Sequence, residues 1–424
     1  MGIGKKLKVL VIGNGAREHA IAWKLLQSPI VTELIVAPGN AGTSEIARNV
    51  QIKPDDIDSL LSFALQNNVD LTVVGPEVPL AIGLTDKFES HGLLVFGPTK
   101  KASQIESSKT FAKKLMQESG VPTANAQTFT SFVEASAHLS SCDVPIVIKA
   151  DGLASGKGVV VANTLQEGLA ALEDCFVKKK FGASGETVLI EEYLSGEELS
   201  VFAFVDGVHV SSLVAACDYK RIYDGDSGPN TGGMGSFTPP FFWNKELENT
   251  IASNIMIPVA KHMSDMGNPY RGILYAGIML TKSGPVVYEF NCRFGDPEAQ
   301  VILPRLKTDM AVVMMAVAQK KLESTQVQWS EDAAVCVVMA SKGYPENYDT
   351  GFEITGLDDP GHSIVFHSGT RKNNTGKYVT DGGRVLSVVS IDNSVSEARL
   401  KTYASLDTIK FKGSFHRTDI ALNK

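Results

Sequence analysis

A carboxylate and an amide stand two residues apart in a segment typical of a β-strand. Residues 286–291 read VVYEFN, so Glu289 and Asn291 share one face, because strand side chains alternate. Carboxylate and amide oxygens suit a hard cation such as the Mg²⁺ carried by a nucleotide. The segment CRFGDPE (292–298) follows at once, and its Arg293 and Asp296 are placed to bind an anion and an ammonium group. A Glu-x-Asn pair without this context is more often a solvated strand face.

A second group of residues suits the binding of phosphates. Residues 145–149 read PIVIK, a predicted strand that ends on Lys149, and residues 151–158 read DGLASGKG. Backbone amides and a lysine at the tip of such a hairpin can cover a polyphosphate. The P-loop pattern GxxxxGK[ST] fails, because Gly158 follows Lys157. The alternative interpretation is a mobile connection between two strands.

Four short β-rich runs near the start of the chain each end in a glycine or proline turn. They are separated by segments of helical length, and one segment carries apolar residues at helical spacing over 57–65. This order predicts a parallel sheet, and such sheets bind ligands outside the carboxyl ends of their strands. The turns are therefore expected to form one ligand-facing rim, unless they are only tight strand exits. The runs lie at 8–12, 33–37, 70–74 and 93–96.

The first of these turns suits a ribose phosphate better than a dinucleotide. Gly13-Asn14-Gly15 begins a GxGxxG pattern, but Glu18 stands where the third glycine belongs. The amides of residues 13–16, at the start of a helix, suit a single phosphate. Arg17 would add positive charge, and Glu77 would accept hydrogen bonds from sugar hydroxyls. The alternative is that both are surface turn residues.

Composition excludes several classes of function. The 424 residues predict about three domains, and 40 basic against 47 acidic side chains give a net charge of −7, which argues against a nucleic-acid-binding protein. No apolar run approaches the roughly 20 residues of a membrane span, and the start lacks a secretory core, so a cytoplasmic protein is expected. The five cysteines form no C-x-x-C pair, so neither a disulfide framework nor a cysteine zinc site is expected.

These residues resemble the ATP-grasp superfamily in order and approximate spacing. Within it the chain is similar to the phosphoribosylamine–glycine ligase family, also called the glycinamide ribonucleotide synthetases. The likeness runs from about residue 8 to the C-terminal region. It rests on GNGAREHA (13–20), APGNAGT (37–43), VVGPEVPLAIGL (73–84), KADGLASGKGV (149–159), GPNTGGMG (228–235) and EFNCRFGDPEAQ (289–300).

The resemblance implies an ATP-grasp fold, a multidomain α/β and α+β architecture. A Rossmann-like parallel-sheet domain is expected over 1–104 and an ATP-grasp domain over 105–331, with a mobile lid at about 123–191. A β-rich domain is expected over 332–424, where residues 333–340, 364–366 and 384–389 have strand character. His367 and Arg371 of that domain are expected in solvated loops, with an approach to the substrate cleft as the alternative.

The resemblance also implies an activity. Family members join glycine to 5-phospho-β-D-ribosylamine through glycyl phosphate, consuming ATP, in the second step of purine biosynthesis. Mg²⁺ is the expected metal and Mn²⁺ its alternative; the expected form is a monomer or weak homodimer that binds neither nucleic acid nor membrane. No protein nucleophile is required. The alternatives are a biotin-carboxylase-like enzyme, a non-catalytic nucleotide sensor and, on GxG alone, a dehydrogenase.

Site residues follow from the resemblance by position. ATP would be bound by Lys109, Lys149, Gly152, Ser155, Gly156, Lys157, Gly158, Glu191, Tyr193, Leu194 and Glu198, and the metal by Glu289 and Asn291. Phosphoribosylamine would be bound by Gly13, Asn14, Gly15, Arg17, Gly39, Asn40 and Glu77. Asp218, Lys220 and Asp296 are the candidates for contacts with glycine and phosphate, and Arg293 is a further substrate-binding candidate. The catalytic residues would be Lys149, Arg293 and Asp296.

The chain departs from the superfamily pattern at one point. Many ATP-grasp enzymes have another acidic metal ligand 12 or 13 residues before the Glu of Glu-x-Asn, whereas Gly277 and Ala276 stand there in this chain. The number of metal ions therefore stays open at this point.

Overall fold

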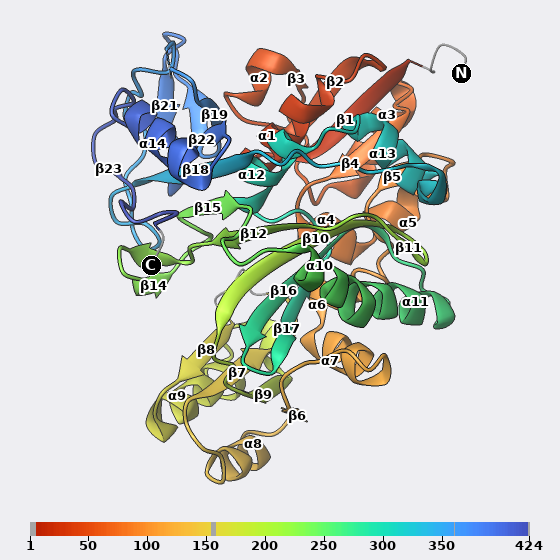
Figure 1. Cartoon of the computed structure of the whole chain (residues 1–424), viewed down its shortest axis with the longest axis vertical. Coiled ribbons are helices and arrows are strands. Elements are labelled where there is room, and N and C mark those ends of the chain that lie inside the picture. Colours follow the sequence, from red (N-terminus) through yellow and green to blue (C-terminus); the bar gives the residue numbers. More distant parts are fainter. Residues whose placement is uncertain (1–5, 154–157, 360, 423–424) are drawn as a thin grey trace.

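The computed structural model describes residues 6–153, 158–359 and 361–422 of the chain. It contains a parallel N-terminal sheet, a long antiparallel sheet and a small four-stranded sheet that projects below them (Figure 1). This mixed α/β architecture confirms the predicted fold class.

The N-terminal sheet is parallel, and its strand order is β3-β2-β1-β4-β5. Its strands are β1 (Leu7–Gly13), β2 (Val31–Pro38), β3 (Arg48–Asn49), β4 (Leu71–Val74) and β5 (Val95–Phe96). Helices pack beside it, among them α1 (Ala16–Leu25), α3 (Ile57–Gln66), α4 (Glu77–Ile82) and α5 (Leu84–Glu89). The four predicted strands and the helix over 57–65 are confirmed, whereas the two-residue β3 was not predicted because it is too short for a pattern. Strand order reverses at β1 and β4, and the turns after these strands lie on one rim.

The long sheet is antiparallel along the order β17-β16-β10-β12-β15-β18-β22-β19. Pairing of β15 with β18 joins strands before residue 331 to strands after 332 in one sheet, so the boundary predicted there falls within a continuous sheet. The strands are β10 (Glu197–Asp206), β12 (Val214–Asp218), β15 (Gly235–Thr238), β16 (Arg271–Thr281), β17 (Gly284–Asn291), β18 (Ala333–Ser341), β19 (Ile364–His367) and β22 (Arg384–Asp392). Helix α14 (Val395–Leu406) packs on β18 and β22.

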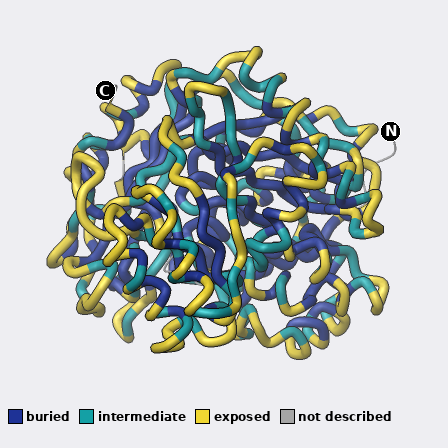
Figure 2. The backbone as a smooth tube through the Cα atoms, turned by 90° about the horizontal axis from the view of Figure 1, so that it is seen from below, coloured by how far each residue is buried: buried dark blue, intermediate teal, exposed yellow. Residues whose placement is uncertain are grey.

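Two buried helices join the N-terminal sheet to the long sheet. Helix α12 (Glu298–Arg305) packs against α1, and α13 (Met310–Ala318) contacts β5, β10 and β16. The latter is apolar on nearly all sides because protein surrounds it, and only Val312 among its large side chains is well exposed. Its N-cap residue is Asp309, whose carboxylate accepts a hydrogen bond of 2.9 Å from the Ala311 amide. Buried backbone runs through the middle of the molecule and exposed loops surround it (Figure 2).

The four-stranded sheet has the antiparallel order β6-β9-β7-β8 and a hydrophobic core of its own. It comprises β6 (Ala126–Phe129), β7 (Ile146–Ala150), β8 (Val159–Ala162) and β9 (Val188–Glu192), covered by α8 (Phe132–Leu139) and α9 (Leu165–Phe176). The predicted strand over 145–149 is confirmed as β7. The predicted glycine loop joins β7 to β8; its residues Ser155, Gly156 and Lys157 lie outside the described residues. No helix in the described part of the chain is both long and apolar enough to cross a membrane.

A pair of buried histidines lies where α1 meets β19. The Nδ1 atom of His19 accepts a hydrogen bond of 2.9 Å from the His367 amide. Burial lowers the pKa of His19 to about 3, helped by His367, and burial lowers the pKa of His367 to about 4, with Glu45 opposing and Lys372 assisting. The expectation that His367 is solvated is therefore wrong. Arg371 is exposed as expected and pairs with Asp381 at 3.2 Å.

These histidines predict a loss of stability in acid. Their folded pKa values lie below the unfolded value of roughly 6.5, so the unfolded chain binds more protons as pH falls. Their contribution is complete above about pH 6.5 and is lost as the pH falls toward 4, with a slope of about 1.4 kcal/mol per pH unit for each histidine. We expect His19→Asn, which keeps an acceptor near the Nδ1 position, to flatten the decline of the unfolding free energy between pH 6 and 4.5. Exposed His91→Asn is the control, and equal slopes in both variants would contradict the assignment.

Candidate active site

Arg293 joins the end of β17 to the N-terminal rim. Its Nη2 lies 2.9 Å from Glu106 Oε1 and donates to Asn291 Oδ1 at 2.9 Å, and its Nε lies 3.6 Å from Glu77 Oε2. Glu77 begins α4, and Glu106 lies on α6 (Gln104–Ser107). Burial opposes the charge of Arg293, but Glu106 and Glu77 outweigh it and raise its pKa. The guanidinium therefore holds two carboxylates already, and its predicted contact with a substrate anion stays a prediction.

Glu18 fills the place of the missing third glycine. Its carboxylate accepts hydrogen bonds from the Gly15 amide at 2.7 Å and from Arg17 Nε at 2.6 Å. A Cβ atom added at Gly13 or Gly75 would come within 2.4 or 2.1 Å of the Glu18 side chain, so both glycines are required for space. A pyrophosphate on this turn would meet a buried carboxylate, which argues against the dinucleotide alternative. The Gly15 amide, predicted to face a phosphate, is bound to Glu18 instead.

Asn40 connects the second rim turn to two neighbouring segments. Its Nδ2 donates to the carbonyl oxygens of Asn14 at 2.9 Å and His367 at 2.7 Å, while its Oδ1 accepts from the amides of Gly42 and Thr43. Gly39 has φ of 74°, and a Cβ there would come 2.5 Å from the Asn49 side chain. The structure therefore gives Asn40 and Gly39 a role in shaping the rim.

Asp296 faces the rim from the segment after β17. It lies 3.5 Å from the position of a Cβ on Gly15, pairs with Arg384 at 3.1 Å and accepts a hydrogen bond from Gln300 at 2.7 Å. Arg384 begins β22, and its Nη1 also donates to the Gly232 carbonyl at 2.6 Å. Three distant segments thus meet at Asp296.

Lysines gather where the four-stranded sheet meets β17. Lys149 Nζ lies 2.7 Å from Glu191 Oε2 and donates to the Tyr288 carbonyl at 2.9 Å. Lys113 lies 3.3 Å from the second Glu191 oxygen, and Lys109 Nζ donates to the Gly152 carbonyl at 2.8 Å. Burial lowers the pKa of Lys109 and of Lys113. Glu191, predicted to meet adenine, holds two lysines in this structure.

The other predicted nucleotide residues that the structure describes lie on or next to β8, β9 and β10. Tyr193 follows β9 and is exposed, and Leu194 is partly exposed beside it. The Gly158 carbonyl accepts a hydrogen bond from the Ala150 amide at 2.8 Å across the hairpin. Glu198 begins β10 with Glu197 and pairs with Lys220 at 2.7 Å. Burial raises the pKa of Asp218 to about 7 although Lys220 opposes the shift.

Glu289 and Asn291 suit a divalent cation. Burial would raise the pKa of Glu289, but Lys220 and Lys149 outweigh it and keep the carboxyl ionised. The Asn291 amide nitrogen faces Glu289 Oε1 at 3.4 Å. Within the described residues no cluster of three or more His, Cys, Asp or Glu side chains is arranged to hold a metal. Two protein ligands suit Mg²⁺, which takes its other ligands from phosphates and water.

Gly277 leaves no room for the acidic ligand found in many ATP-grasp enzymes. It pairs with Glu289 across β16 and β17. A Cβ there would come 2.7 Å from the Tyr288 ring and 2.9 Å from the Glu289 side chain. The ring of Tyr288 therefore fills the space in which such a side chain would begin.

Five contact residues of the site were not predicted from the sequence. Lys113 had a usable signal, because it stands four residues after Lys109 on the same face of α7 (Lys109–Glu118). The others take their roles from contacts between distant segments; they are Glu18, Glu106, Tyr288 and Arg384.

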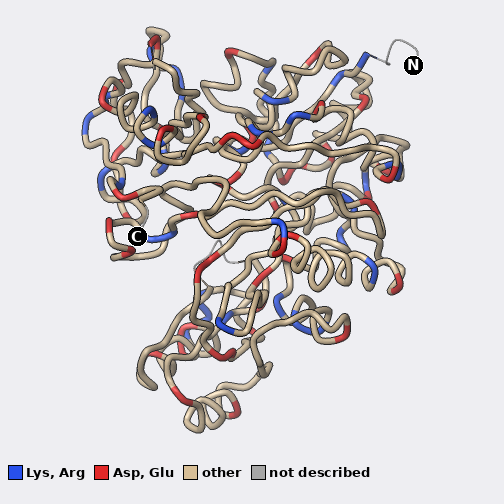
Figure 3. Tube along the Cα trace, in the orientation of Figure 1, with Lys and Arg blue, Asp and Glu red and all other residues tan. Residues whose placement is uncertain are grey.

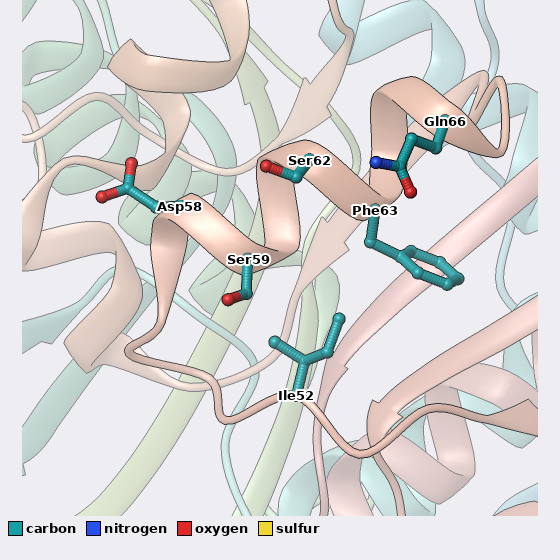
Figure 4. A pocket seen from close by; sticks show the side chains of 6 residues that line it. All are labelled: Ile52, Asp58, Ser59, Ser62, Phe63 and Gln66. Carbon is teal, nitrogen blue, oxygen red and sulfur yellow. The ribbon is translucent and has the colours of Figure 1, made fainter.

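Neither the charge distribution nor a hollow on α3 suggests another site. Basic and acidic residues are interspersed along the trace (Figure 3). The hollow has a volume of about 490 Å³, and none of its lining residues is a predicted site residue (Figure 4). It is lined by Ile52, Asp58, Ser59, Ser62, Phe63 and Gln66.

Comparisons with known proteins cover nearly the whole chain. Phosphoribosylglycinamide synthetase models match as the N domain over residues 7–106, the ATP-grasp (A) domain over 107–299 and the C domain over 334–423. A phosphoribosylamine–glycine ligase from Caldanaerobacter subterraneus is 48% identical over 415 residues, which are 98% of this chain and 99% of the relative. The crystal structure of a phosphoribosylamine–glycine ligase from Thermotoga maritima has a TM-score of 0.85 at 31% identity and covers 97% of this chain and 100% of its own.

A more distant match shows the fold alone. The biotin carboxylase domain of a Hydrogenobacter thermophilus 2-oxoglutarate carboxylase has a TM-score of 0.74 at 13% identity, covering 97% of this chain and 92% of its own. The fold, the ATP-grasp (A) domain match and the ligase relatives define the protein's class as an ATP-grasp enzyme, an ATP-dependent ligase. The full-length matches go further, and the chain belongs to the phosphoribosylglycinamide synthetase family.

The Arg293 contacts predict a specific effect on stability. Arg293→Met leaves Glu106 buried without its cation, and we expect the unfolding free energy to fall by about 3 kcal/mol. The double variant with Glu106→Gln removes the uncompensated charge and should recover at least half of this loss. Arg371→Met removes an exposed pair and should change the unfolding free energy by under about 0.5 kcal/mol. Urea denaturation measures all three, and equal stability of the single and double variants would contradict the pairing.

Proposed function

We propose that the protein ligates glycine to 5-phosphoribosylamine, forming glycinamide ribonucleotide, ADP and phosphate, in the second step of purine biosynthesis. The observation that carries the proposal is the continuous segment 289–298. It begins at Glu289 beside the lysines and passes through Arg293 to Asp296 beside the rim. These ten residues thus join the lysines, where ATP would bind, to the rim, where the sugar phosphate would bind. A ligase with three substrates requires both sites close together. The 48% identity to named ligases supports the same activity.

The chemistry requires activation of a carboxylate. Glycine is a poor electrophile because its leaving group would be oxide, so a carboxylate oxygen first attacks the γ-phosphorus and ADP leaves. The phosphoribosylamine nitrogen then attacks the carbonyl of glycyl phosphate, phosphate leaves and the nitrogen loses a proton. Positioning and neutralisation of charge are the protein's contributions.

The lysine side of the site would hold ATP. Lys109 and Lys149 would bind the phosphates under the Gly152–Gly158 loop, and residues 191–194 with Glu198 would bind the nucleoside. Glu289 and Asn291 would hold Mg²⁺, or Mn²⁺, which supplies positive charge to the phosphates when bound. The ionised state of Glu289 fits this role.

The rim side would hold the sugar phosphate and receive glycine next to it. Gly13, Asn14, Arg17, Asn40 and Glu77 would surround phosphoribosylamine. Asp218 would receive the ammonium group of glycine, and Lys220, close to Glu289, would face both the glycine carboxylate and the phosphate transferred to it. Arg293 and Asp296 would lie between the lysine side and the rim side of the site. We further propose a cytoplasmic monomer or weak homodimer.

Oxygen transfer tests the proposed reaction. With ATP, Mg²⁺, phosphoribosylamine and glycine labelled with ¹⁸O in its carboxylate, we expect one ¹⁸O atom in each phosphate released. Phosphate release should require both glycine and phosphoribosylamine. Mass spectrometry of the phosphate gives the result; unlabelled phosphate would refute the mechanism, and turnover with bicarbonate in place of glycine would favour a carboxylase.

Substitution of Glu289 tests the metal site. Glu289→Gln keeps the size of the side chain but loses its charge, and we expect kcat to fall at least roughly a hundredfold with little change in melting temperature. Binding of Mn²⁺ with a non-hydrolysable ATP analogue, followed by electron paramagnetic resonance, should weaken in parallel. Exposed Glu134→Gln is the control. Unchanged Mn²⁺ affinity in Glu289→Gln would remove Glu289 from the ligand set.

A further inference from the structure

Strand β17 contains one extra residue where it passes the lysines. Val287 pairs with Ile278 and Glu289 with Gly277, so Tyr288 has no partner of its own on β16. This is a β-bulge, in which the extra residue leaves the ladder and its groups take other partners. The bulge lies in the hairpin beside the four-stranded sheet that carries Lys149 (Figure 1).

The backbone of the bulged residue takes a lysine as its partner. The Tyr288 carbonyl accepts a hydrogen bond of 2.9 Å from Lys149 Nζ, which is also 2.7 Å from Glu191. Strand β17 ends the strand order of the long sheet, so this carbonyl can face the four-stranded sheet rather than β16. The bulge therefore gives the lysine of the four-stranded sheet a fixed contact on the long sheet.

The side chain of the same residue holds a second lysine. Lys220 Nζ donates to the Tyr288 hydroxyl at 3.0 Å, lies 4.9 Å from the ring centroid and pairs with Glu198 Oε2 at 2.7 Å. These contacts combine a charge-assisted hydrogen bond, a cation–π contact and an ion pair. They use two of the three N–H bonds of the ammonium and leave one for a ligand, counting the partners in the described part of the chain.

Space for the ring comes from the opposite strand. A Cβ on Gly277 would come 2.7 Å from the Tyr288 ring, so any larger residue there would displace it. Lys220 and Lys149 are also the two cations with the greatest influence on Glu289. Both therefore act on the same carboxylate, next to the bulge.

We infer that Tyr288 is a positioning residue of the nucleotide site, which fixes Lys220 through its hydroxyl and ring and Lys149 through its carbonyl. Two ammonium groups, one on the four-stranded sheet and one in the connection after β12, are thereby held ready for a polyphosphate before it binds. This pre-organisation lowers the entropy cost of ordering the two long lysine side chains when a ligand binds. This inference rests on the proposed function only in that the site binds ATP.

Two substitutions separate the contributions of the side chain. Tyr288→Phe keeps the ring and the backbone carbonyl but loses the hydroxyl, and we expect the Kd of a non-hydrolysable ATP analogue with Mg²⁺ to rise roughly tenfold. Tyr288→Leu also loses the ring face, and the Kd should rise a further three- to tenfold, roughly. Calorimetric titration without glycine or phosphoribosylamine gives these values independently of turnover.

A double-variant cycle distinguishes positioning from a structural role. Because the hydroxyl acts through Lys220, Tyr288→Phe should add less than about twofold to the Kd of Lys220→Met. Tyr403→Phe, which removes a hydroxyl donating to the Arg417 carbonyl at 2.8 Å on the C-terminal part of the chain, is the control for a lost buried hydrogen bond. It should lower the melting temperature and leave the Kd unchanged.

The outcomes separate this inference from the proposed function. If the wild-type protein fails to bind the analogue, the proposed function fails. If the wild type binds and Tyr288→Phe binds equally well, or if its effect adds fully to that of Lys220→Met, the inference about Tyr288 is overturned while the proposed function stands.

Discussion

Pairing of buried opposite charges is the constraint on which the site depends. A charge removed from water is costly unless a partner compensates it. Arg293 meets Glu77 and Glu106 from two N-terminal helices, and Asp296 meets Arg384 from the far end of the long sheet. Each pair joins segments that are distant in the chain, so the contacts that satisfy these charges also fix the two halves of the site against each other.

The same constraint arranges the residues expected to meet substrates. Glu191 holds Lys113 and Lys149, Glu198 holds Lys220, and Glu18 occupies the Gly15 amide. A polyphosphate bound as proposed would therefore meet cations whose positions are already set by carboxylates. Glu289 differs from these carboxylates. Lys220 and Lys149 keep it ionised, which suits the metal ligand that it is proposed to be.

Local departures from regular structure supply the remaining precision. Glu18 stands where a dinucleotide-binding turn has its third glycine. Its carboxylate fills the space beside Gly13 and accepts the hydrogen bond of the Gly15 amide. The bulge at Tyr288 frees one carbonyl and one side chain from the β17 ladder and gives each a lysine. Gly277 is required beside it, because the ring occupies the space of a side chain. These features change the chemistry of common folds without changing their topology.

The sequence by itself determined the strands of the N-terminal sheet, the helix over 57–65, the β7–β8 hairpin and the Glu289-x-Asn291 strand, because periodicity and turn residues are local properties. The long blocks shared with a known family also indicated the fold and the ligase activity. The tertiary structure alone decided which segments meet. It decided that β18 extends the long sheet and that Tyr288 has no partner on β16. It also decided that Arg293 is held by Glu77 and Glu106, and that His367 is buried against His19. Spacing along a chain carries no information about which distant segments meet, and both the pairing of a buried charge and the register of a strand are set by that meeting.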